Sequence, residues 1–395
     1  MAPNFSLRDI VRPNILALKP YRCARDDYDS GILLDANENS LGPAVNASQA
    51  AAAHAQALHR YPDPLHRSVK ERIAKLRQLP STDHIFLGVG SDEVIDLLVR
   101  IFCVPAKDKI LITPPTYGMY NVTAQINDVA VVKVPLLVDQ AIPARMFQLD
   151  VPNVLRAVEA DPTIKMVFVC SPGNPTGTLI DPQDVQTLLD HPGYRGLVVV
   201  DEAYVDFVET HKGGSLAQWV ERYPNLVVMQ TMSKSFGLAG IRLGLAIAHP
   251  DVITLLNNTK APYNVSTLTA TVAMAALDDE GIAVMQGAAA KLRDQRARLI
   301  RELPKIRGVG QIIGGNDANF VLCQILTRPD GSRSDGQPDQ ARALRVYERM
   351  AQECGLVVRF RGTEYGCDGC LRITVGSPEE NDELLKQLAA NLEIL

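Results

Sequence analysis

The chain has 395 residues, of which 46% are hydrophobic and 22% charged, so it can bury large cores without disulfides or metals. Both fractions are close to globular averages and argue against extended disorder, collagen or a long coiled coil. Forty Lys and Arg residues against 45 Asp and Glu give a net charge of −5, and the sequence has no long basic run, which disfavours a dedicated nucleic-acid or membrane-surface binder.

The start of the chain and its cysteines predict a reducing compartment. No window reaches 18 consecutive apolar residues, and MAPNFSLRDIVRP lacks the apolar stretch of a secretory signal, so we expect a cytoplasmic protein. The seven cysteines are odd in number and widely spread, which makes a poor disulfide framework. Cys367 and Cys370 form a C-x-x-C pair, but a zinc site needs about four ligands, so unpaired thiols are favoured over a metal site.

The first two-thirds of the chain predict an α/β fold. An Ala-rich stretch from Ala44 to Leu58 is expected to be a helix on propensity. Beyond it, strand-length apolar runs alternate with helical patterns, which is typical of βαβ units around a mostly parallel sheet. Five runs lead into polar motifs: HIFL (84–87) into GVGSDE, KILIT (109–113) into PPTY, IKMVFVC (164–170) into SPGNP, LVVV (197–200) into DEAY, and NLVVMQ (225–230) into TMSK. Because ligands of open α/β sheets bind beyond the carboxyl ends of the strands, these motifs predict one composite site.

After about residue 270 the pattern changes. A long amphipathic helix is predicted at 287–303, followed by shorter strands at NFVLC (319–323), LVVRF (356–360) and LRITV (371–375), which together indicate a separate α+β domain. The hydrophilic segment from Thr327 to Gln340 is rich in turn formers and is expected to be a surface loop. The expected organisation is an N-terminal arm with part of a small domain (1–35), a large domain (36–270) and a C-terminal small domain (271–395).

Lys234 and Asp201 carry the strongest chemical signal. Lys234 lies between a predicted strand and a Gly-rich turn, where a lysine can form a Schiff base with a carbonyl substrate or pyridoxal phosphate if its surroundings lower the amine pKa. Alone, it would be interpreted as a solvated surface lysine. Asp201 follows LVVV, and a buried carboxylate there needs a cation such as the pyridinium nitrogen of pyridoxal phosphate. Tyr204 and Asn174 can address the phenolic oxygen of that ring and Tyr117 its face, although SPGNPTG also fits a simple tight turn and Tyr117 a core aromatic.

The phosphate of such a cofactor needs hydrogen-bond donors, and GVGSDE offers them. If Ser91 caps the helix EVIDLLVRIF, the backbone N–H groups at the helix start point at the anion, and the side chains of Asp92 and Glu93 face away. Ser233 and Arg242 can complete this cradle, because a guanidinium grips two oxygens. GVGSDE is also half of a dinucleotide fingerprint, but Glu93 stands in place of the third glycine, so a nicotinamide dehydrogenase is disfavoured.

Arg359 and Arg372 lie in the apolar runs LVVRF and LRITV with a turn-rich segment between them. If these strands pair as a hairpin, the two arginines are cross-strand neighbours, and their mutual repulsion calls for an anion such as a carboxylate or phosphate. Surface arginines of an ordinary edge hairpin are the alternative.

Together these motifs resemble the fold-type I, class I/II pyridoxal-phosphate-dependent aminotransferases, and more narrowly the histidinol-phosphate aminotransferase family. The resemblance covers nearly the whole chain and is carried by LDANENSLGP (34–43), RYPDP (60–64), GVGSDE (88–93), PPTYGMY (114–120), SPGNPTG (171–177), DEAYVDF (201–207), SKSFGLAGIRLG (233–244), DANFVL (317–322) and CLRITVGSPEEN (370–381). RYPDP, DEAYVDF and LRITVG in this order are its most specific part. Ser40 and Gly173 depart from the Pro and Asn that are usual in the family.

The resemblance implies a large domain with a mostly parallel seven-stranded sheet between helices, a smaller α+β domain, and a homodimer with shared active sites. It implies that Lys234 binds the cofactor and exchanges protons and that Asp201 holds the pyridine nitrogen. The other implied roles are ring-oxygen contacts for Tyr204 and Asn174, stacking for Tyr117, a phosphate cup of Ser91, Asp92, Glu93, Ser233 and Arg242, a contact of Tyr61 with the neighbouring subunit's cofactor phosphate, and substrate binding by Arg359, Arg372 and Asn37.

The activity implied is amino transfer between L-histidinol phosphate and 2-oxoglutarate in histidine biosynthesis, giving imidazole-acetol phosphate and glutamate. Because histidinol phosphate has no α-carboxylate, a pair of arginines explains how one pocket takes both a phosphate ester and glutamate. The alternatives are an aromatic amino-acid aminotransferase, a decarboxylase of a phosphorylated amino acid such as threonine phosphate, and a non-catalytic cofactor-binding regulator. Small-molecule substrates are expected, with no nucleic acid, membrane or metal partner.

Overall fold

The computed structural model describes residues 11–19, 21–45, 58–138, 145–327 and 336–395. The helix expected from Ala44 to Leu58 falls almost entirely outside the described residues, as does much of the loop expected from Thr327 to Gln340. Short 3₁₀ turns occur in several connections, among them η1 (Ala24–Asp26), η3 (Thr82–His84) and η5 (Val205–Phe207). The arm also contains the short helix α2 (Pro13–Leu16).

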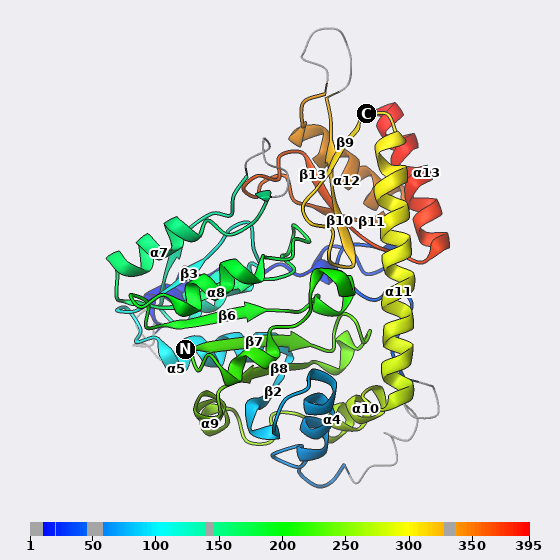
Figure 1. Ribbon diagram of the computed structural model, residues 1–395. Coiled ribbons are helices and arrows are strands. Elements are labelled where there is room, and N and C mark those ends of the chain that lie inside the picture. Colours follow the sequence, from blue (N-terminus) through cyan, green and yellow to red (C-terminus); the bar gives the residue numbers. More distant parts are fainter. Residues whose placement is uncertain (1–10, 20, 46–57, 139–144, 328–335) are drawn as a thin grey trace, which may run out of the picture.

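A seven-stranded sheet forms the centre of the larger part of the molecule (Figure 1). Its spatial order is β2 (Ile85–Val89), β8 (Leu243–Ala248), β7 (Leu226–Thr231), β6 (Leu197–Asp201), β5 (Ile164–Cys170), β3 (Lys109–Ile112) and β4 (Ala130–Lys133). Strand β8 runs antiparallel to both neighbours, and the other six strands are parallel to one another. The mostly parallel α/β sheet predicted from the sequence is therefore confirmed, with strand ends shifted by one or two residues. The largest shift is at β2, because His84 belongs to η3 and the strand continues to Val89.

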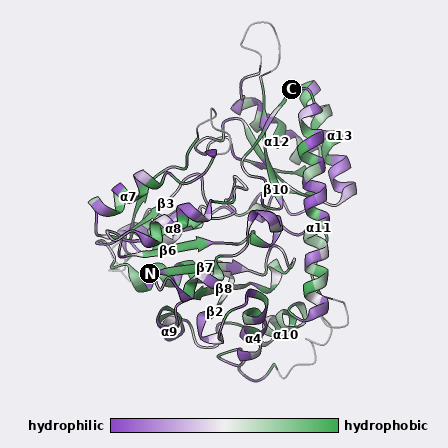
Figure 2. Cartoon of the chain, in the orientation of Figure 1, coloured by the Kyte–Doolittle hydropathy of each residue, from purple (hydrophilic) through white to green (hydrophobic). Residues whose placement is uncertain are grey.

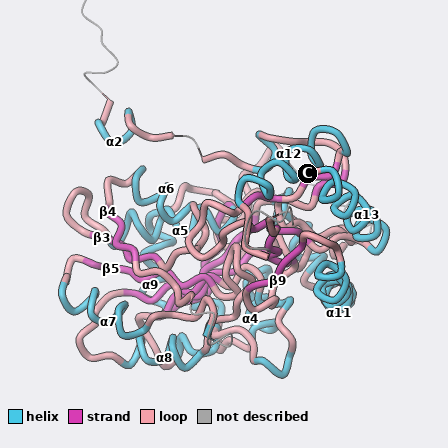
Figure 3. Tube along the Cα trace, turned by 90° about the horizontal axis from the view of Figure 1, so that it is seen from above, coloured by secondary structure: helices cyan, strands magenta, loops and turns pink. Residues whose placement is uncertain are grey.

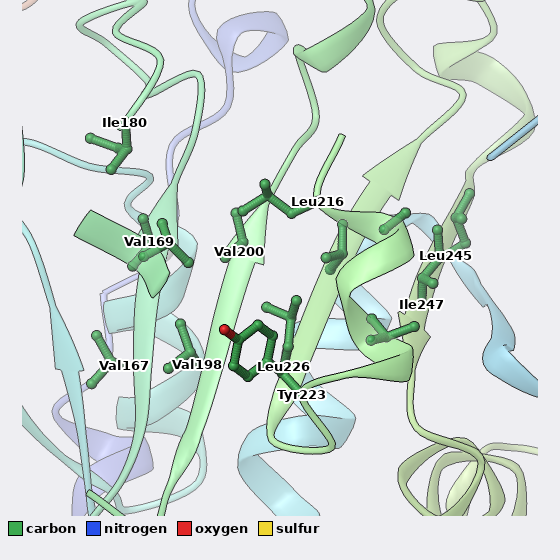
Figure 4. Close-up of a cluster of buried hydrophobic side chains, with 14 of the residues drawn as sticks. Val167, Val169, Ile180, Val198, Val200, Leu216, Tyr223, Leu226, Leu245 and Ile247 are labelled. Carbon is green, nitrogen blue, oxygen red and sulfur yellow. The ribbon is translucent and has the colours of Figure 1, made fainter. Parts of the chain in front are cut away.

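Buried strands alternate their side chains between the two faces of this sheet, as the pleat requires. Val198 and Val200 of β6 lie in the cluster drawn in Figure 4, and Val199 between them lies in the cluster on the opposite face. Buried residues of α4 (Arg67–Arg77), α7 (Val151–Ala160) and α8 (Pro182–Asp190) cover the first face, and those of α5 (Gly90–Phe102), α6 (Met119–Ile126) and α9 (Pro250–Thr259) cover the second. Figure 3 shows α5 and α6 on one side of the strands and α7 and α8 on the other.

Side-chain caps define where several helices begin. Asp150 accepts a hydrogen bond from the N–H of Asn153 at the start of α7, and Asp181 accepts one from the N–H of Gln183 at the start of α8. Ser266 caps α10 (Thr267–Ala276) in the same way. The domain boundary expected near residue 270 falls inside α10 and stays a prediction.

A second, four-stranded antiparallel sheet lies beside the long helix α11 (Asp279–Glu302), in the order β12 (Arg359–Phe360), β13 (Cys370–Thr374), β10 (Phe320–Ile325) and β9 (Val309–Ile313). Helices α12 (Gln340–Cys354) and α13 (Pro378–Ile394) share its apolar cluster. The run LVVRF, expected to be one strand, is instead divided between two sheets. Its first half forms β11 (Leu356–Val357), which pairs with β1 (Ile32–Leu33), and Arg359 and Phe360 form β12.

Hydropathy follows this layering (Figure 2). The strands of the central sheet are largely hydrophobic, whereas α11 and α13 carry both hydrophobic and hydrophilic residues. Within the described part of the chain, no helix combines the length and apolar character needed to cross a membrane.

Candidate active site

A cavity of about 240 Å³ lies beyond the carboxyl ends of the parallel strands. Most of the residues singled out in the sequence line it together: Asn37, Ser91, Asp92, Tyr117, Asn174, Asp201, Tyr204, Ser233, Lys234, Arg242, Arg359 and Arg372. The five polar motifs thus converge as the strand pattern predicted. Glu93 and Tyr61 are not among the lining residues.

Lys234 follows β7, and its amine faces the cavity. Its Nζ donates a hydrogen bond to the backbone oxygen of Ala36 at 2.9 Å and lies 5.9 Å from the ring centre of Tyr204. Loss of solvent around the amine lowers its pKa from 10.5 to about 8, and the positive charges of Arg372 and Arg242 act in the same direction. A large part of the amine is therefore neutral near pH 8, as a nucleophilic lysine requires.

Asp201 is the last residue of β6 and is 4% exposed. Its Oδ2 accepts a hydrogen bond from the Tyr120 hydroxyl at 2.6 Å, and its Oδ1 accepts one from the N–H of Ala203 at 3.2 Å. Burial raises its pKa to about 6 against the lowering effect of these two bonds. No ion pair among the described residues includes Asp201, so this buried carboxylate has room for a cationic partner from a ligand.

Tyr120 was not singled out in the sequence, although PPTYGMY contains it. It lies three residues after Tyr117, which places both on the same side of the chain as α6 begins. The two rings are edge-on with centres 5.6 Å apart, and Tyr120 stacks on Phe168 at 4.7 Å. The spacing of three residues from Tyr117 was the only hint in the sequence that Tyr120 lies near the site. The contact of Tyr120 with Asp201 depends on how β6 and α6 pack.

Tyr204 and Asn37 form a buried polar pair beside Lys234. The Tyr204 hydroxyl accepts a hydrogen bond from Asn37 Nδ2 at 2.9 Å, and Asn37 is fixed by Thr374, whose hydroxyl accepts from the Asn37 N–H at 3.0 Å. Burial raises the pKa of Tyr204 to about 12, although the charge of Arg372 and the bond from Asn37 lower it. The phenol therefore stays protonated and keeps a proton to donate into the cavity.

The start of α5 and the residues before β8 form a cluster of donors. Helix α5 begins at Gly90, so Ser91 lies in its first turn and does not cap it; the expected Ser91 cap is wrong. The N-cap is Val89, two residues earlier and without a side-chain cap, and the chain turns into the helix through Gly90, whose φ of +70° favours glycine. The first-turn N–H groups still lack intrahelical partners. Arg242 Nη1 lies 3.5 Å from Ser233 Oγ, and its Nη2 lies 3.4 Å from an Asp92 carboxylate oxygen.

Two glycines bring backbone and guanidinium together in this cluster. A Cβ on Gly90 would lie 2.5 Å from Arg242 Nη2, and one on Gly244 would lie 2.2 Å from the Ser91 nitrogen. A side chain at position 90 would therefore collide with the Arg242 guanidinium, and one at position 244 would collide with the backbone at the start of α5. This close approach is what a small tetrahedral anion needs from its surroundings.

Glu93 and Tyr61 point elsewhere. Glu93 Oε2 accepts hydrogen bonds from the Val89 N–H at 2.5 Å and from Asn264 Nδ2 at 2.9 Å, so its side chain braces the turn before α5. Tyr61 is 81% exposed and stacks on Tyr263 with ring centres 4.6 Å apart. The functional roles implied for both remain predictions.

Arg359 and Arg372 are register partners across β12 and β13, as the hairpin hypothesis required. Arg372 is 3% exposed; it donates to Asn174 Oδ1 at 2.6 Å and to the backbone oxygen of Asp35 at 2.5 Å. Its Nε is buried without a hydrogen-bond partner among the described residues. Burial, with the nearby charge of Arg361, lowers its pKa to about 9. An anion entering the cavity would compensate the buried positive charge of Arg372.

Several lining residues were not singled out in the sequence. They come from the N-terminal segment, from the residue that ends β7 and from the turn after β12: Tyr21, Arg22, Glu38, Thr231 and Arg361. Thr231 could have been noticed because it follows the predicted strand 225–230 directly, and its hydroxyl donates to Ser233 Oγ at 2.9 Å.

Acidic, histidine and cysteine side chains do not gather into a metal centre here. In residues 11–19, 21–45, 58–138, 145–327 and 336–395, no group of three or more His, Cys, Asp or Glu could hold a metal ion. All seven cysteines fall in these ranges and are free, and Cys367 and Cys370 are both buried.

The fold and the site define an aminotransferase of class I and II, since residues 29–388 match the model of the "Aminotransferase class I and II" family. Within this class the chain belongs to the histidinol-phosphate aminotransferase family. It is 46% identical to the histidinol-phosphate aminotransferase of Candida maltosa over 98% of both chains, and 47% identical to that of Schizosaccharomyces pombe at the same coverage. The structure of the Sinorhizobium meliloti histidinol-phosphate aminotransferase in complex with pyridoxal-5'-phosphate has the same fold, with a TM-score of 0.82, 22% identity and 98% coverage of both chains.

Proposed function

We propose that this protein transfers the amino group of L-histidinol phosphate to 2-oxoglutarate, with pyridoxal phosphate as its cofactor. The choice of substrate rests on the relatives named above. The observation that carries the chemistry is the meeting, in one cavity, of an amine of lowered pKa at Lys234 and a buried carboxylate without a cation at Asp201. These are the two groups that a pyridoxal-dependent reaction requires.

The described residues fit this cofactor. Asp201 would hold the pyridine nitrogen, Tyr204 and Asn174 the phenolic oxygen, and Tyr117 the ring face. The phosphate would lie at the first turn of α5 with Ser91, Ser233 and Arg242, where Gly90 leaves room for the Arg242 guanidinium and Gly244 lets β8 pack directly on the backbone of that turn. Among the described residues, Lys234 is the one lysine that lines the cavity, so it would bond the aldehyde.

The chain's own residues then have distinct tasks. When bound, pyridoxal phosphate supplies an electron-poor ring that stabilises negative charge on the carbon bearing the substrate amine. Lys234 Nζ would remove the proton from that carbon and deliver it to the carbon that was the aldehyde of the cofactor, and its pKa of about 8 suits both transfers near neutral pH. Asp201 keeps a proton on the ring nitrogen, and Arg372 holds the anionic end of the substrate. We further propose that the positive charge of Arg359 joins Arg372 when that end is a phosphate.

The lowered pKa of Lys234 predicts a pH dependence for cofactor capture. Only the neutral amine attacks an aldehyde, and at pH 8 about half of it is neutral at a pKa of about 8, against about 0.3% at 10.5. Mixing cofactor-free protein with pyridoxal phosphate should therefore give a rate of chromophore formation that rises from pH 6.5 to about 8 and levels off by about pH 9. A rate that still rises tenfold per pH unit up to pH 10 would contradict the lowered pKa.

We also propose that the active form is a homodimer in which Tyr61 reaches the partner's cavity. Tyr61 is far more exposed than an aromatic side chain usually is, and Tyr263 beneath it is 41% exposed. Leu58 and Leu65, close to Tyr61 in the sequence, are 56% and 48% exposed. An apolar surface of this kind favours burial against a second copy of the chain.

The function is tested by measuring the amino-donor half-reaction with histidinol phosphate and with phenylalanine. We expect kcat/KM for histidinol phosphate to exceed that for phenylalanine by about 100-fold or more, because the phosphate can engage Arg372 and Arg359 together. Equal or faster turnover of phenylalanine would favour an aromatic aminotransferase. Release of carbon dioxide from threonine phosphate would favour the decarboxylase alternative.

A further inference from the structure

The N-terminal segment from Tyr21 to Asp27 forms one wall of the cavity. Tyr21 and Arg22 line it, and the ring of Tyr21 packs edge-on against Tyr117 with centres 6.5 Å apart. Arg25 ties the segment to two other residues that line the cavity, Asp35 at 3.1 Å and Glu38 at 2.8 Å. The charges on this segment therefore shape the potential that an anionic substrate meets.

Asp27 lies between two arginines of this wall. Its Oδ2 accepts a hydrogen bond from Arg359 Nη1 at 3.0 Å, and its Oδ1 pairs with the guanidinium of Arg22. Arg359 Nη2 also donates to the backbone oxygen of Arg22 at 3.3 Å. The Asp27 side chain is 12% exposed and that of Arg359 19%, whereas Arg22 is 74% exposed. Two guanidinium groups repel each other, so Asp27 is what holds Arg22 and Arg359 side by side at the cavity.

Arg372 is held differently. Its partners are an amide oxygen of Asn174 and a backbone oxygen of Asp35, and no ion pair among the described residues neutralises it. One carboxylate is sufficient to compensate its charge. A phosphate monoester carries about −1.5 to −2 charges at pH 7 and has three acceptor oxygens, so it needs further cations beside Arg372.

We propose that Asp27 is a positioning and specificity-determining residue, which holds Arg22 and Arg359 where they receive the phosphate of the phosphorylated substrate. Glutamate presents two separate carboxylates of one charge each and no dianionic group, so its binding should rest mainly on Arg372 and change little when this pair is displaced. This role rests on the proposed function and adds to it a residue whose loss should weaken binding of the phosphorylated substrate and not binding of glutamate. It assigns the N-terminal segment a direct part in choosing the phosphate ester.

The test is the variant Asp27→Asn, which keeps the shape of the side chain and removes its charge. We expect KM for histidinol phosphate to rise about tenfold, because charge-assisted hydrogen bonds from two arginines are weakened. KM for glutamate and both kcat values should change by less than about twofold. Asp27→Glu keeps the charge and should recover most of the lost affinity. Inorganic phosphate, as an inhibitor of the glutamate half-reaction, should show the same tenfold weakening without any turnover of the phosphorylated substrate.

Asp161→Asn is the matched control, because it also removes the charge of a paired aspartate. Asp161 pairs with Lys109 at 2.7 Å at the amino ends of β3 and β5, the ends away from the cavity. It should leave both KM values unchanged. An equal rise of KM for both substrates in Asp27→Asn would overturn the proposal, as would tighter binding of histidinol phosphate and inorganic phosphate. If the unmodified protein does not use histidinol phosphate, the proposed function fails, and inhibition by inorganic phosphate still decides the role of Asp27.

Discussion

Replacing Lys234 with alanine is expected to lower the rate of the amino-donor half-reaction by about 10³-fold or more. The variant loses the amine that bonds the aldehyde and also the base that moves the proton, and general acid–base catalysis alone contributes about 10²- to 10⁴-fold. The variant should fold normally, because the amine makes a single hydrogen bond, to the backbone oxygen of Ala36. The measurement is a single-turnover rate with histidinol phosphate, together with the absorbance of protein-bound pyridoxal phosphate.

Two further variants separate the chemistry of Lys234 from its charge. Lys234→Arg retains a positive charge, but a guanidinium does not lose its proton near neutral pH, so activity should stay as low as in the alanine variant. Lys386→Ala changes an exposed lysine on α13 and should leave the rate unchanged. Retention of more than about a tenth of the activity in Lys234→Ala would exclude the assigned role.

The substitution Asp201→Asn is expected to lower the same rate by about 10²- to 10³-fold. Asparagine can accept the same hydrogen bond from Tyr120, so the geometry is retained while the negative charge that keeps the ring nitrogen protonated is lost. Tyr120→Phe keeps the charge and removes the hydrogen bond, so its loss of rate should be much smaller. Equal losses in the two variants would show that Asp201 acts through its position and not through its charge.

Stability of the cofactor-free protein gives an independent measure of Asp201. The folded-state pKa of about 6 lies above the value of an unfolded aspartate, so the folded state binds more protons between about pH 4 and 6 and loses stability as the pH rises through this window. Asp201→Asn removes this loss. We therefore expect its Tm at pH 8 to equal or exceed that of the unmodified protein, although its activity is far lower.

Much of the fold and most of the site could be predicted because strands of a parallel sheet that are buried on both faces consist of uninterrupted apolar runs in the sequence. Val198, Val199 and Val200 are all buried, on alternating faces, so the run LVVV marks both the strand and its end. The polar residue that follows then lies at the sheet edge. Asp201 at the end of β6 and Lys234 after β7 could therefore be located from the sequence without tertiary contacts.

One error in the predicted elements has a local cause and the other a long-range cause. The N-cap of α5 was placed at Ser91, two residues after the observed Val89, because a capping side chain was expected and the observed N-cap residue uses none. LVVRF was divided between two sheets because Leu356 and Val357 pair with β1, a partner more than 300 residues earlier that no local pattern reveals.

The cavity wall formed by Tyr21 to Asp27 could not be predicted either, because its partners also lie far away in the sequence. Asp27 meets Arg359 across 332 positions of sequence, and neither residue belongs to a periodic pattern. Such contacts depend on how the arm crosses the cavity entrance, which composition and spacing do not encode.

The reversed direction of β8 has a consequence for how the site is assembled. Because β8 begins at the edge where β7 ends, the connection 232–242 alone supplies Ser233, Lys234 and Arg242. Closing so short a connection costs little chain entropy, so this piece of the site is built by one contiguous peptide. A circular permutant opened within that connection would separate the lysine from the arginine, whereas permutants opened at other surface turns would leave them joined.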